Sequence, residues 1–509
     1  MVATKAGEIL RVLKETPIWH QYLLTVQPRD EKQAKRVLMV PAWEPLMTLF
    51  ADSSGEWALW TPEGFYDASV IGDEFFGWQV SQGWNRQPRY FRADQFREDL
   101  ERPAVMRRIL ETGNLDDAMK AAKAKFPGTL EDAISNLSLL VPHVKIVEPR
   151  HNQTIAAGEM IRVLARVDFP KERNPEDYAI RCYVNGVSAG EPTGKIQDDV
   201  SVFEWRALPT SEDNLIRINV EPKAGNLQEK YGFAEVDVRA TPQLARRKLY
   251  TVALAADDYS GENRLRYAVA DARRVISSVR SGAAKLYEPA SETTLVNHNI
   301  TPATVRRSIE RIHATISDES NPQSLLFVFV AGHGVADGNE YYFLPPASKF
   351  DQASLKKWGI SWQLLRQLGN VPCRKIFLLD TCYSGNVVLA EKKEESIAYH
   401  WKAAIRPLRR TQALVLTATA PGIPAFEPDD LKHGYFTYGV LRALSGEADG
   451  HFLQGQKPQM RDGIVDVREF VNYVVREVRG LSKNLQQPQA TPSTLGTVPL
   501  VRPGSDQAQ

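Results

Sequence analysis

The hydrophobic residues of the 509-residue chain follow three successive patterns. Residues 1–140 mix tryptophan and other aromatic residues with glycine, proline and charged residues, which predicts short strands and turns followed by helices. Residues 141–240 consist of short alternating segments separated by turn residues, a pattern typical of antiparallel strands. From residue 246 onward, continuous apolar segments alternate with amphipathic segments of helical period. Several domains of different classes are therefore expected.

The third pattern predicts an α/β domain over residues 246–480. Its strands are apolar throughout and alternate with helices, which favours a mostly parallel sheet flanked by helices. The strand spacing in residues 141–240 predicts a small all-β sandwich of the immunoglobulin-like type. We assign residues 1–140 to a mixed N-terminal docking or regulatory module. Residues 481–509 are rich in proline, glutamine, serine and threonine, and are expected to form an extended or disordered tail.

Two helices are predicted within the N-terminal module, and each has a candidate N-terminal cap. Asp94 precedes the segment QFREDLERPAVMRRILETG, and Asn114 precedes LDDAMKAAKAKF. The short polar side chains of aspartate and asparagine accept hydrogen bonds from the first amides of a helix. No chemistry is assigned to this module from its sequence.

Composition and charge limit the kinds of binding partner and the cellular compartment that are expected. The formal net charge of +1 gives no support for nucleic acid or an anionic membrane as the main partner. Three cysteines are too few for a disulfide framework and fit a reducing compartment, and we interpret Cys182 as buried packing. There is no apolar signal segment and no apolar run that could span a bilayer, so we expect a soluble cytoplasmic protein.

Two apolar strands of the α/β domain stop on residues with chemical function. FVFVAGHG (327–334) leads to His333, and RKIFLLDTCYSG (374–385) leads to Cys382. The segment between them holds one helical crossover, so the strands can be parallel neighbours about 4.8 Å apart. Ligands of open α/β sheets bind outside the carboxyl ends of the strands. The sequence therefore predicts that both side chains reach a common groove.

A cysteine and a histidine in one groove can act as a nucleophile and its base. The thiolate is the reactive form of cysteine, and an imidazole can take the thiol proton and later protonate a leaving amine. The amide of Gly334, together with that of Cys382, would form an oxyanion hole. Taken singly, a histidine at a strand end is more often a solvated polar group and a lone cysteine more often buried packing. The prediction therefore depends on the pair.

Residues 246–480 resemble the caspase-like cysteine peptidases of bacteria, which are related to metacaspases and orthocaspases. The resemblance is carried by LAADDY with LRYAVADARRV, FVFVAGHG, YYFLP, GISWQLL, IFLLDTCYSG, VLTATA and HGYFTYGVLRAL. It implies that His333 is the general base and Cys382 the nucleophile, with no cofactor. It also implies cleavage after Arg or Lys, whose side chain would bind Asp271 in the first helix and Asp380 two residues before the nucleophile. A carboxylate pair would bind a guanidinium and reject an aspartate side chain.

Each of the two acidic residues has a structural alternative. Asp271 can be a solvated helix residue, and Asp380 can accept a hydrogen bond from a nearby backbone amide. The preceding segments WALWTPEGFYDAS and GDEFFGW also resemble these bacterial proteins, and residues 141–240 resemble their immunoglobulin-like spacer. Bacterial relatives often act in defence or programmed cell death, so the resemblance suggests such a role.

Two features of the chain depart from the family pattern. Tyr383 stands where many relatives have histidine. Some metacaspases need calcium, bound by an aspartate cluster, whereas the aspartates between the catalytic candidates are isolated: Asp337, Asp351 and Asp380. We therefore expect no metal site. The acidic segment EPDDLKHG (427–434) is interpreted as an exposed loop.

A long charged connection follows the strand of the candidate nucleophile, NVVLAEKKEESIAYHWKAAIRPLRR (386–410). Long loops at the mouth of a cleft are commonly lids or regulatory segments. If the pocket prefers basic residues, Lys392, Lys393, Arg409 and Arg410 are candidates for self-cleavage. The alternative is a solvated surface helix.

The leading hypothesis is a regulated cysteine endopeptidase whose substrate is a protein with Arg or Lys before the scissile bond. Residues 1–240 are expected to bind a regulatory protein partner. One alternative is a catalytically idle caspase-fold scaffold that binds a partner protein, and a second is another thiol enzyme on a doubly wound sheet, such as an acyl transferase or amidase. The joint presence of His333, Cys382, Asp271 and Asp380 counts against both alternatives.

Overall fold

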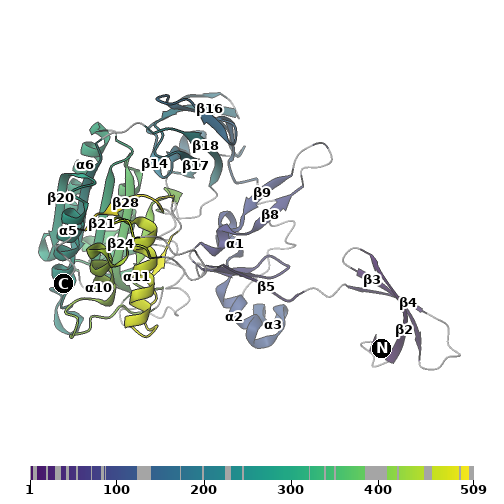
Figure 1. The fold of residues 1–509 in the computed structure, drawn as a ribbon. Helices are drawn as coiled ribbons and strands as arrows, with labels where there is room; N and C mark the ends of the chain where they lie inside the picture. Colours follow the sequence, from purple (N-terminus) through teal and green to yellow (C-terminus); the bar gives the residue numbers. More distant parts are fainter. Residues whose placement is uncertain are drawn as a thin grey trace. The chain divides into compact units, whose positions relative to one another are not determined.

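The computed structural model describes most of the chain (Figure 1). It describes residues 2–3, 9–18, 21–28, 36–41, 45–52, 56–69, 71–81, 85, 88–122, 134, 139–171, 173–197, 200–223, 231–242, 246–319, 321–337, 340–348, 351–383, 408, 410–420, 423–451, 461–491 and 494–503. For a minority of these the backbone alone is described: 2–3, 9–18, 21–28, 36–41, 98, 195–197, 200, 336–337, 340 and 382–383.

The chain divides into two compact units. The first unit comprises Met1–Gly77 and Arg97–Ala133, and the second comprises Trp78–Phe96 and Ile134–Gln509. The expected module over residues 1–140 is therefore not one compact unit, because its middle segment packs with the second unit.

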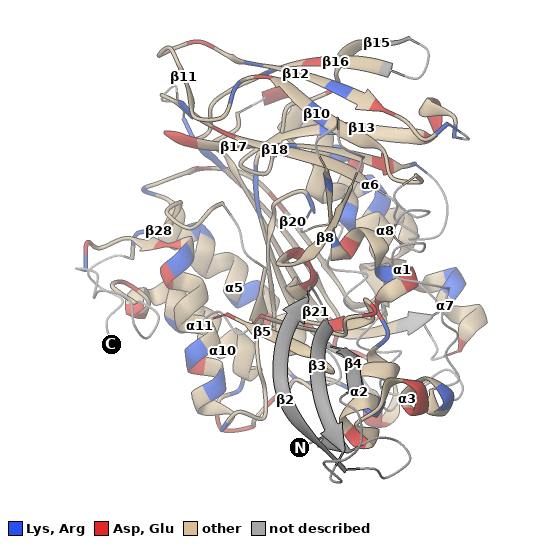
Figure 2. Ribbon diagram, turned by 90° about the vertical axis from the view of Figure 1, so that its right-hand side faces the viewer, with Lys and Arg blue, Asp and Glu red and all other residues tan. Residues whose placement is uncertain are grey.

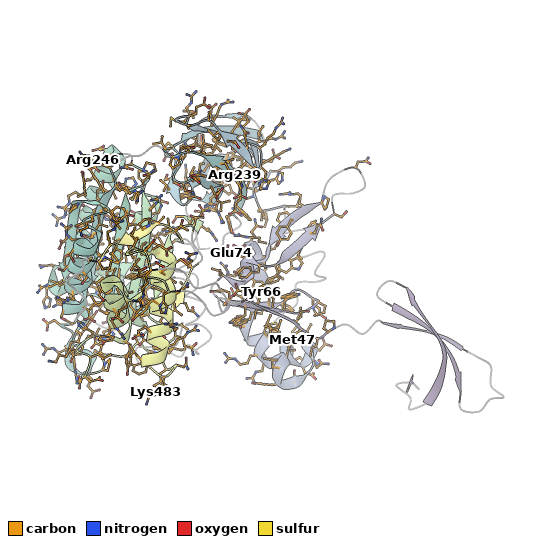
Figure 3. The ribbon with its side chains drawn as sticks, viewed as in Figure 1. Met47, Tyr66, Glu74, Arg239, Arg246 and Lys483 are labelled. Atoms are coloured by element: carbon orange, nitrogen blue, oxygen red, sulfur yellow. The ribbon has the colours of Figure 1, made fainter. Side chains whose placement is uncertain are left out.

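The first unit contains two small antiparallel sheets and a helical region. One sheet consists of β1 (Val2–Ala3), β2 (Ile9–Ile18), β3 (Gln21–Pro28) and β4 (Arg36–Pro41). The other consists of β5 (Thr48–Ala51), β6 (Trp57–Trp60) and β7 (Tyr66–Ala68), with α1 (Arg97–Leu100), α2 (Pro103–Thr112) and α3 (Leu115–Ala121) following. Figure 3 labels Met47, Tyr66 and Glu74 of this unit. Phe65, Val105, Met106, Ile109 and Ala118 form its core.

The two cap predictions have opposite outcomes. Asn114 caps α3, because its side chain accepts a hydrogen bond of 3.0 Å from the Asp117 amide. The Asp94 prediction is wrong: Asp94 lies in the short helix η2 (Ala93–Phe96), and its carboxylate pairs with Arg92 at 3.0 Å and accepts the Tyr231 hydroxyl. These partners satisfy the carboxylate in place of helix amides.

Residues 141–240 form the all-β sandwich that the sequence predicts. One sheet contains β10 (His143–Glu148), β12 (Ile161–Asp168), β16 (Val200–Ala207) and β15 (Thr193–Gln197). The other contains β11 (Gln153–Ile155), β18 (Gly232–Ala240), β17 (Asp213–Pro222), β13 (Tyr178–Val184) and β14 (Val187–Ser188). Residues from both sheets share one core that includes Cys182 and Trp205. The packing role expected for Cys182 is confirmed by its full burial.

A larger, mostly parallel sheet follows the sandwich, and the second unit is therefore mixed α/β as expected. Its main path runs in the order β20 (Glu288–Val296), β19 (Lys248–Ala255), β21 (Leu325–Asp337), β24 (Arg374–Tyr383), β25 (Leu414–Thr417) and β27 (Gln489–Ala490). The pairs along this path are parallel except the last, β25 with β27. The end of β21 forms a hairpin with β22 (Glu340–Phe343), and β22 in turn pairs antiparallel with β23 (Ile360–Ser361).

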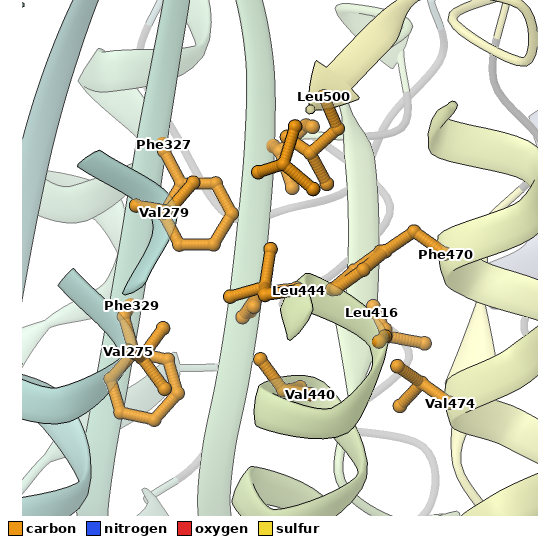
Figure 4. Close-up of a cluster of buried hydrophobic side chains, with 14 of the residues drawn as sticks. Val275, Val279, Phe327, Phe329, Leu416, Val440, Leu444, Phe470, Val474 and Leu500 are labelled. Atoms are coloured by element: carbon orange, nitrogen blue, oxygen red, sulfur yellow. The ribbon is translucent and has the colours of Figure 1, made fainter. Parts of the chain in front are cut away.

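Helices cover both faces of the larger sheet (Figure 2). On one face lie α5 (Ala268–Ala283), α10 (Tyr435–Arg442) and α11 (Val467–Leu481), and on the other lie α6 (Pro302–Glu319) and α8 (Trp362–Leu365). Figure 4 shows how Val275 and Val279 of α5 face Phe327 and Phe329 of β21. On this face the apolar side chains come from every second residue of each strand, as the pleat requires.

The expectation of a tail outside the core is wrong for part of residues 481–509. β27 pairs with β25, and β28 (Pro499–Val501) pairs with β26 (Val465–Asp466) at the start of α11. Four apolar residues of this stretch belong to the core beneath α5 and α11: Leu495, Val498, Leu500 and Val501. They were missed because their stretch is short, is interrupted by Gly496, Thr497 and Pro499, and lies in a segment rich in proline, glutamine, serine and threonine.

The sandwich and the larger sheet share polar contacts within the second unit. Figure 3 labels Arg239 on β18, the last strand of the sandwich along the chain, and Arg246 just before β19, the first strand of the larger sheet. The chain passes from the sandwich to the larger sheet between these two residues. Tyr183 donates a hydrogen bond of 3.0 Å to the side-chain oxygen of Asn370, and Arg374 donates one of 2.8 Å to the Thr210 carbonyl.

Among the described residues of the chain, no helix is long and apolar enough to cross a bilayer.

Candidate functional site

His333 and Cys382 are direct neighbours across two parallel strands. They are register partners of β21 and β24, two residues beyond the pair Ala331 and Asp380. Register partners on neighbouring parallel strands lie on one face of the pleated sheet, about 4.8 Å apart in the hydrogen-bonding direction. The structure thus brings the candidate base and the candidate nucleophile to adjacent positions, as the sequence predicts. The Cys382 side chain is outside the described part of the chain.

The expectation that both residues come after their strands is wrong. β21 continues to Asp337 because Gly334–Asp337 pair with β22, which folds back antiparallel. β24 continues to Tyr383 because it follows β21 through the pair Gly334 and Tyr383. The backbone around the two residues is therefore held by ladder hydrogen bonds rather than by a loop.

The loop after β19 fixes the orientation of the His333 ring. The ring Nε2 lies 2.7 Å from the Asn263 carbonyl oxygen, which can only accept, so Nε2 carries the proton. Nδ1 is then the nitrogen with a lone pair that can take a proton. The Tyr259 ring packs on the imidazole at a centroid distance of 4.4 Å, and its hydroxyl accepts the His333 amide at 3.0 Å. Burial lowers the pKa of His333, and the bond to Asn263 opposes this effect.

The other two cysteines are unsuited to nucleophilic chemistry. Cys182 and Cys373 are both fully buried and form no disulfide. Burial raises the pKa of the Cys373 thiol to about 12 and moves the pKa of Cys182 further upward still. A thiol that stays protonated at neutral pH is a poor nucleophile. Cys382 is therefore the one cysteine of the sequence that is left as a candidate.

The glycines on either side of His333 are required by packing. Gly332 has φ of +144°, and a Cβ there would meet the Tyr259 hydroxyl at 2.8 Å. A Cβ on Gly334 would coincide with the hydroxyl of Tyr341, which donates a hydrogen bond of 3.1 Å to Thr381. Packing thus accounts for the absence of a side chain at Gly334. The role of its amide in an oxyanion hole stays a prediction.

Asp271 and Asp380 meet beside the candidate dyad, as the resemblance implies. Asp271 is 2% exposed on α5, so it is not the solvated helix residue of the alternative reading. Both of its oxygens are bonded: one to the His433 Nδ1 and the other to the Gly434 amide at 3.0 Å. Asp380 accepts the Thr437 hydroxyl at 2.9 Å, a side-chain partner rather than the backbone amide of its alternative reading.

The two carboxylates lie close enough to affect each other. A Cβ on Gly434 would lie 3.4 Å from an oxygen of Asp380 and 3.8 Å from an oxygen of Asp271. Burial, reinforced by the negative charge of Asp271, raises the pKa of Asp380 to about 7. Such a site favours a ligand that brings a positive charge, because a cation would relieve both effects.

Glu427 is a third acidic residue of this site that the sequence interpretation missed. It is partly buried, its two oxygens accept the amides of Arg266 at 2.9 Å and Tyr267 at 3.4 Å, and burial and the charge of Asp271 raise its pKa. The reading of EPDDLKHG as an exposed loop is therefore wrong for Glu427 and for the buried Gly434, although Asp429 and Asp430 are exposed. In the sequence, the acidic run EPDDLKHG, which ends in His-Gly, was the signal that could have pointed to these residues.

The self-cleavage candidates fall into two groups. Lys392, Lys393 and Arg409 lie outside the described residues. Arg410 is described and is 4% exposed: its guanidinium lies 3.8 Å from the centroid of the Tyr231 ring, and its carbonyl accepts the Asn219 side chain at 3.0 Å. A peptidase needs an accessible backbone around the bond it cuts, so Arg410 is not a cleavage site in this fold.

Comparisons with known proteins add little to this geometry. No family model and no curated protein matches the chain. The M1 domain from titin is similar at 12% identity and a TM-score of 0.14, over 20% of this chain and 92% of that one. Titin M4 is similar at 15% identity and a TM-score of 0.14, over 20% of this chain and 99% of that one. TM-scores this low carry no argument about fold or function.

Proposed function

We propose that the chain is a caspase-like cysteine endopeptidase that cuts peptide bonds after Arg or Lys. The observation that carries the proposal is the register pairing of His333 with Cys382, two residues beyond Asp380 on β24. A nucleophile and its base are thus on adjacent strands, and one acidic residue of the pocket lies on the strand of the nucleophile. The likeness to bacterial caspase-like peptidases, based on the motifs of residues 246–480, supports the same assignment.

The proposed reaction uses the lone pair on His333 Nδ1. That nitrogen takes the Cys382 proton, and the thiolate attacks the substrate carbonyl to form a tetrahedral intermediate. The imidazolium then gives the proton to the leaving amine, and water releases the acyl group from sulfur. The bond between Nε2 and Asn263 and the packing of Tyr259 support this role, because they hold the ring in the required tautomer.

The proposed pocket for the basic side chain contains Asp271, Asp380 and Glu427. A guanidinium or ammonium placed among them would neutralise carboxylates that are crowded and partly dehydrated. An acidic substrate side chain would add a further negative charge to the same space, which is strongly unfavourable. The pocket therefore supports discrimination between basic and acidic substrates more strongly than between Arg and Lys.

Hydrolysis of fluorogenic peptides tests the proposal. Three peptides that differ only in the residue before the bond, Arg, Lys or Asp, are compared on the wild-type chain and on Cys382→Ala, with Cys373→Ala as the matched cysteine control. We expect turnover of the Arg and Lys peptides, a loss on the order of 10⁴-fold in Cys382→Ala, and near-normal turnover in folded Cys373→Ala. Turnover of the Asp peptide alone, or activity that persists in Cys382→Ala, would contradict the proposal.

A further inference from the structure

The segment HGYFT, which opens α10, holds the acidic site from one side. His433 bonds one oxygen of Asp271 through Nδ1, and the Gly434 amide bonds the other oxygen at 3.0 Å. Thr437, one turn into the helix, bonds Asp380 at 2.9 Å. Of these three donors His433 alone can carry a full positive charge. The candidate pocket therefore has a titratable group of its own in contact with one of its carboxylates.

His433 also faces outward. Its side chain is 26% exposed, whereas that of Asp271 is 2% exposed. It lines a cavity of about 1290 Å³ together with Ser277 of α5 and Tyr438 of α10. Because Nδ1 must donate to the carboxylate, a proton is gained or lost at Nε2. A side chain that lines an open cavity can exchange that proton with solvent while its bond to Asp271 persists.

Charged groups on several elements lie around His433 and Asp271. Asp380 from β24 and Glu427 from the segment before α10 interact electrostatically with Asp271. Asp271 itself, from α5, bonds the His433 ring and attracts its imidazolium form. Arg274 of α5 and Arg442 of α10 line the same cavity and repel that form, although Arg442 is paired with Glu447 and Glu477. Tyr438 of α10 also lines the cavity, and Tyr435 is the other tyrosine of that helix.

We propose that His433 is a specificity-determining residue: as an imidazolium it acts as the internal counter-ion of Asp271 and competes with the basic side chain of the substrate. This inference rests on the proposed function. A positive charge at position 433 neutralises Asp271, so a substrate cation gains less by entering. Without that charge the carboxylates depend on the substrate for their positive charge. Binding of a basic group should therefore be weaker with a fixed cation at position 433 than with a neutral hydrogen-bond donor there.

Asp380 changes its charge near neutral pH, and this effect must be kept apart from that of position 433. Burial and the charge of Asp271 raise the pKa of Asp380 to about 7, so it loses its proton as the pH rises through neutrality. Variants at position 433 are therefore compared at a single pH of about 8, where Asp380 is mostly ionised.

The experiment measures binding of benzamidine, whose amidinium group resembles the head of an arginine side chain, by titration calorimetry at a pH of about 8. It uses the full chain with Cys382→Ala, so the result does not depend on turnover. His433→Gln places a neutral hydrogen-bond donor at this position, and His433→Lys places a charged one. His433→Lys should bind benzamidine about fivefold more weakly than His433→Gln. His451→Gln, in the same cavity, should bind as the His433 parent does.

His433→Asn and His433→Arg form a second neutral and charged pair, which tests the proposal if one of the first two variants fails to fold. Equal affinities of the neutral and the charged variant, or no benzamidine binding, would overturn the inference. Hydrolysis of the Arg peptide by the wild-type chain is measured alongside. Absence of turnover with the expected difference in affinity would overturn the peptidase proposal and leave the pocket standing. Normal turnover with equal affinities would overturn the inference alone.

Discussion

An ionisable side chain is buried or partly buried near each end of β24, and the two side chains have opposite kinds of neighbours. Near the start of the strand Lys375 is 1% exposed and binds two carbonyl oxygens, those of Gly186 in the sandwich and Val371 at 3.3 Å. Near the end, partly buried Asp380 receives one hydroxyl, from Thr437, and faces the negative charge of Asp271. The first charge is surrounded by acceptors, whereas the second is next to a charge of its own sign.

This difference separates a structural charge from one available to a ligand. A buried cation bonded to carbonyls is locked in the fold and joins two regions of the second unit. A buried carboxylate next to another carboxylate is unfavourable until a cation arrives, and that free energy can favour a basic ligand. At both ends of β24 the surroundings disfavour the charged form of the side chain. Burial lowers the pKa of Lys375 to about 8, and burial together with the charge of Asp271 raises the pKa of Asp380 to about 7.

Removing the charge at the end of β24 is expected to have the largest effect. In Asp380→Asn, kcat/KM for an Arg peptide should fall about 100-fold or more relative to that for an otherwise identical norleucine peptide, because a charge-assisted bond to the substrate is lost. Peptide hydrolysis at pH 8 measures this ratio. Asp430→Asn, at an exposed acidic residue nearby, is the matched control and should leave the ratio unchanged.

The same substitution should also stabilise the fold at high pH. The pKa of Asp380 is raised from about 4 in the unfolded chain to about 7 in the folded chain, so its contribution to stability is complete below pH 4 and is lost as the pH rises to 7. Asp380→Asn avoids this loss and should gain up to roughly 4 kcal/mol at pH 8 and little at pH 4. A variant less stable than wild type at pH 8 would show that Asp380 is a structural charge like Lys375.

Removing the charge at the start of β24 should affect stability and leave chemistry intact. The pKa of Lys375 is lowered from about 10.4 in the unfolded chain to about 8, so its stabilising contribution is present above pH 10.4 and is lost as the pH falls through 8. The free energy of unfolding of wild type relative to Lys375→Met should therefore rise by roughly 1–3 kcal/mol between pH 7 and pH 10. Urea unfolding at several pH values measures it.

Lys356→Met, at an exposed lysine of α7 (Gln352–Trp358), controls for the loss of a positive charge and should show no such rise. The kcat/KM of folded Lys375→Met for the Arg peptide should equal that of wild type. A drop comparable to that of Asp380→Asn would mean that the two ends of β24 are coupled, and the contrast between them would not hold.

The central strands and helices could be predicted because each carries its own pattern. β19, β21 and β24 are apolar throughout since helices cover both faces of the sheet, and α5 and α11 show an apolar stripe. The extension of β21 past His333 could not be predicted, because it depends on a hairpin with β22. β28 was missed for a similar reason: its partner is β26, more than thirty residues earlier in the chain.

The candidate site was predictable to the same extent. Two strands with a strong apolar pattern carry His333, Cys382 and Asp380. Their proximity could therefore be predicted from the expected pairing of these strands. Glu427 and His433 lie on an irregular segment. Their contacts, with the amides at the start of α5 and with Asp271, join residues about 160 positions apart, and no local pattern encodes such a contact.

The smallest expected effect concerns Tyr341, whose hydroxyl lies against Gly334 and donates a bond of 3.1 Å to Thr381 on β24, between Asp380 and Cys382. Tyr341→Phe removes this bond inside the fold and should cost about 1 kcal/mol in the free energy of unfolding, with kcat/KM for the Arg peptide unchanged within about twofold. Tyr90→Phe, at a ring that is 58% exposed, is the control and should change neither quantity. If kcat fell tenfold or more in Tyr341→Phe with KM unchanged, the hydroxyl would have to stabilise the transition state itself. The contact between Tyr341 and Thr381 would then take part in the chemistry at the reactive end of β24, and the glycine beside His333 would be explained by chemistry as well as by packing.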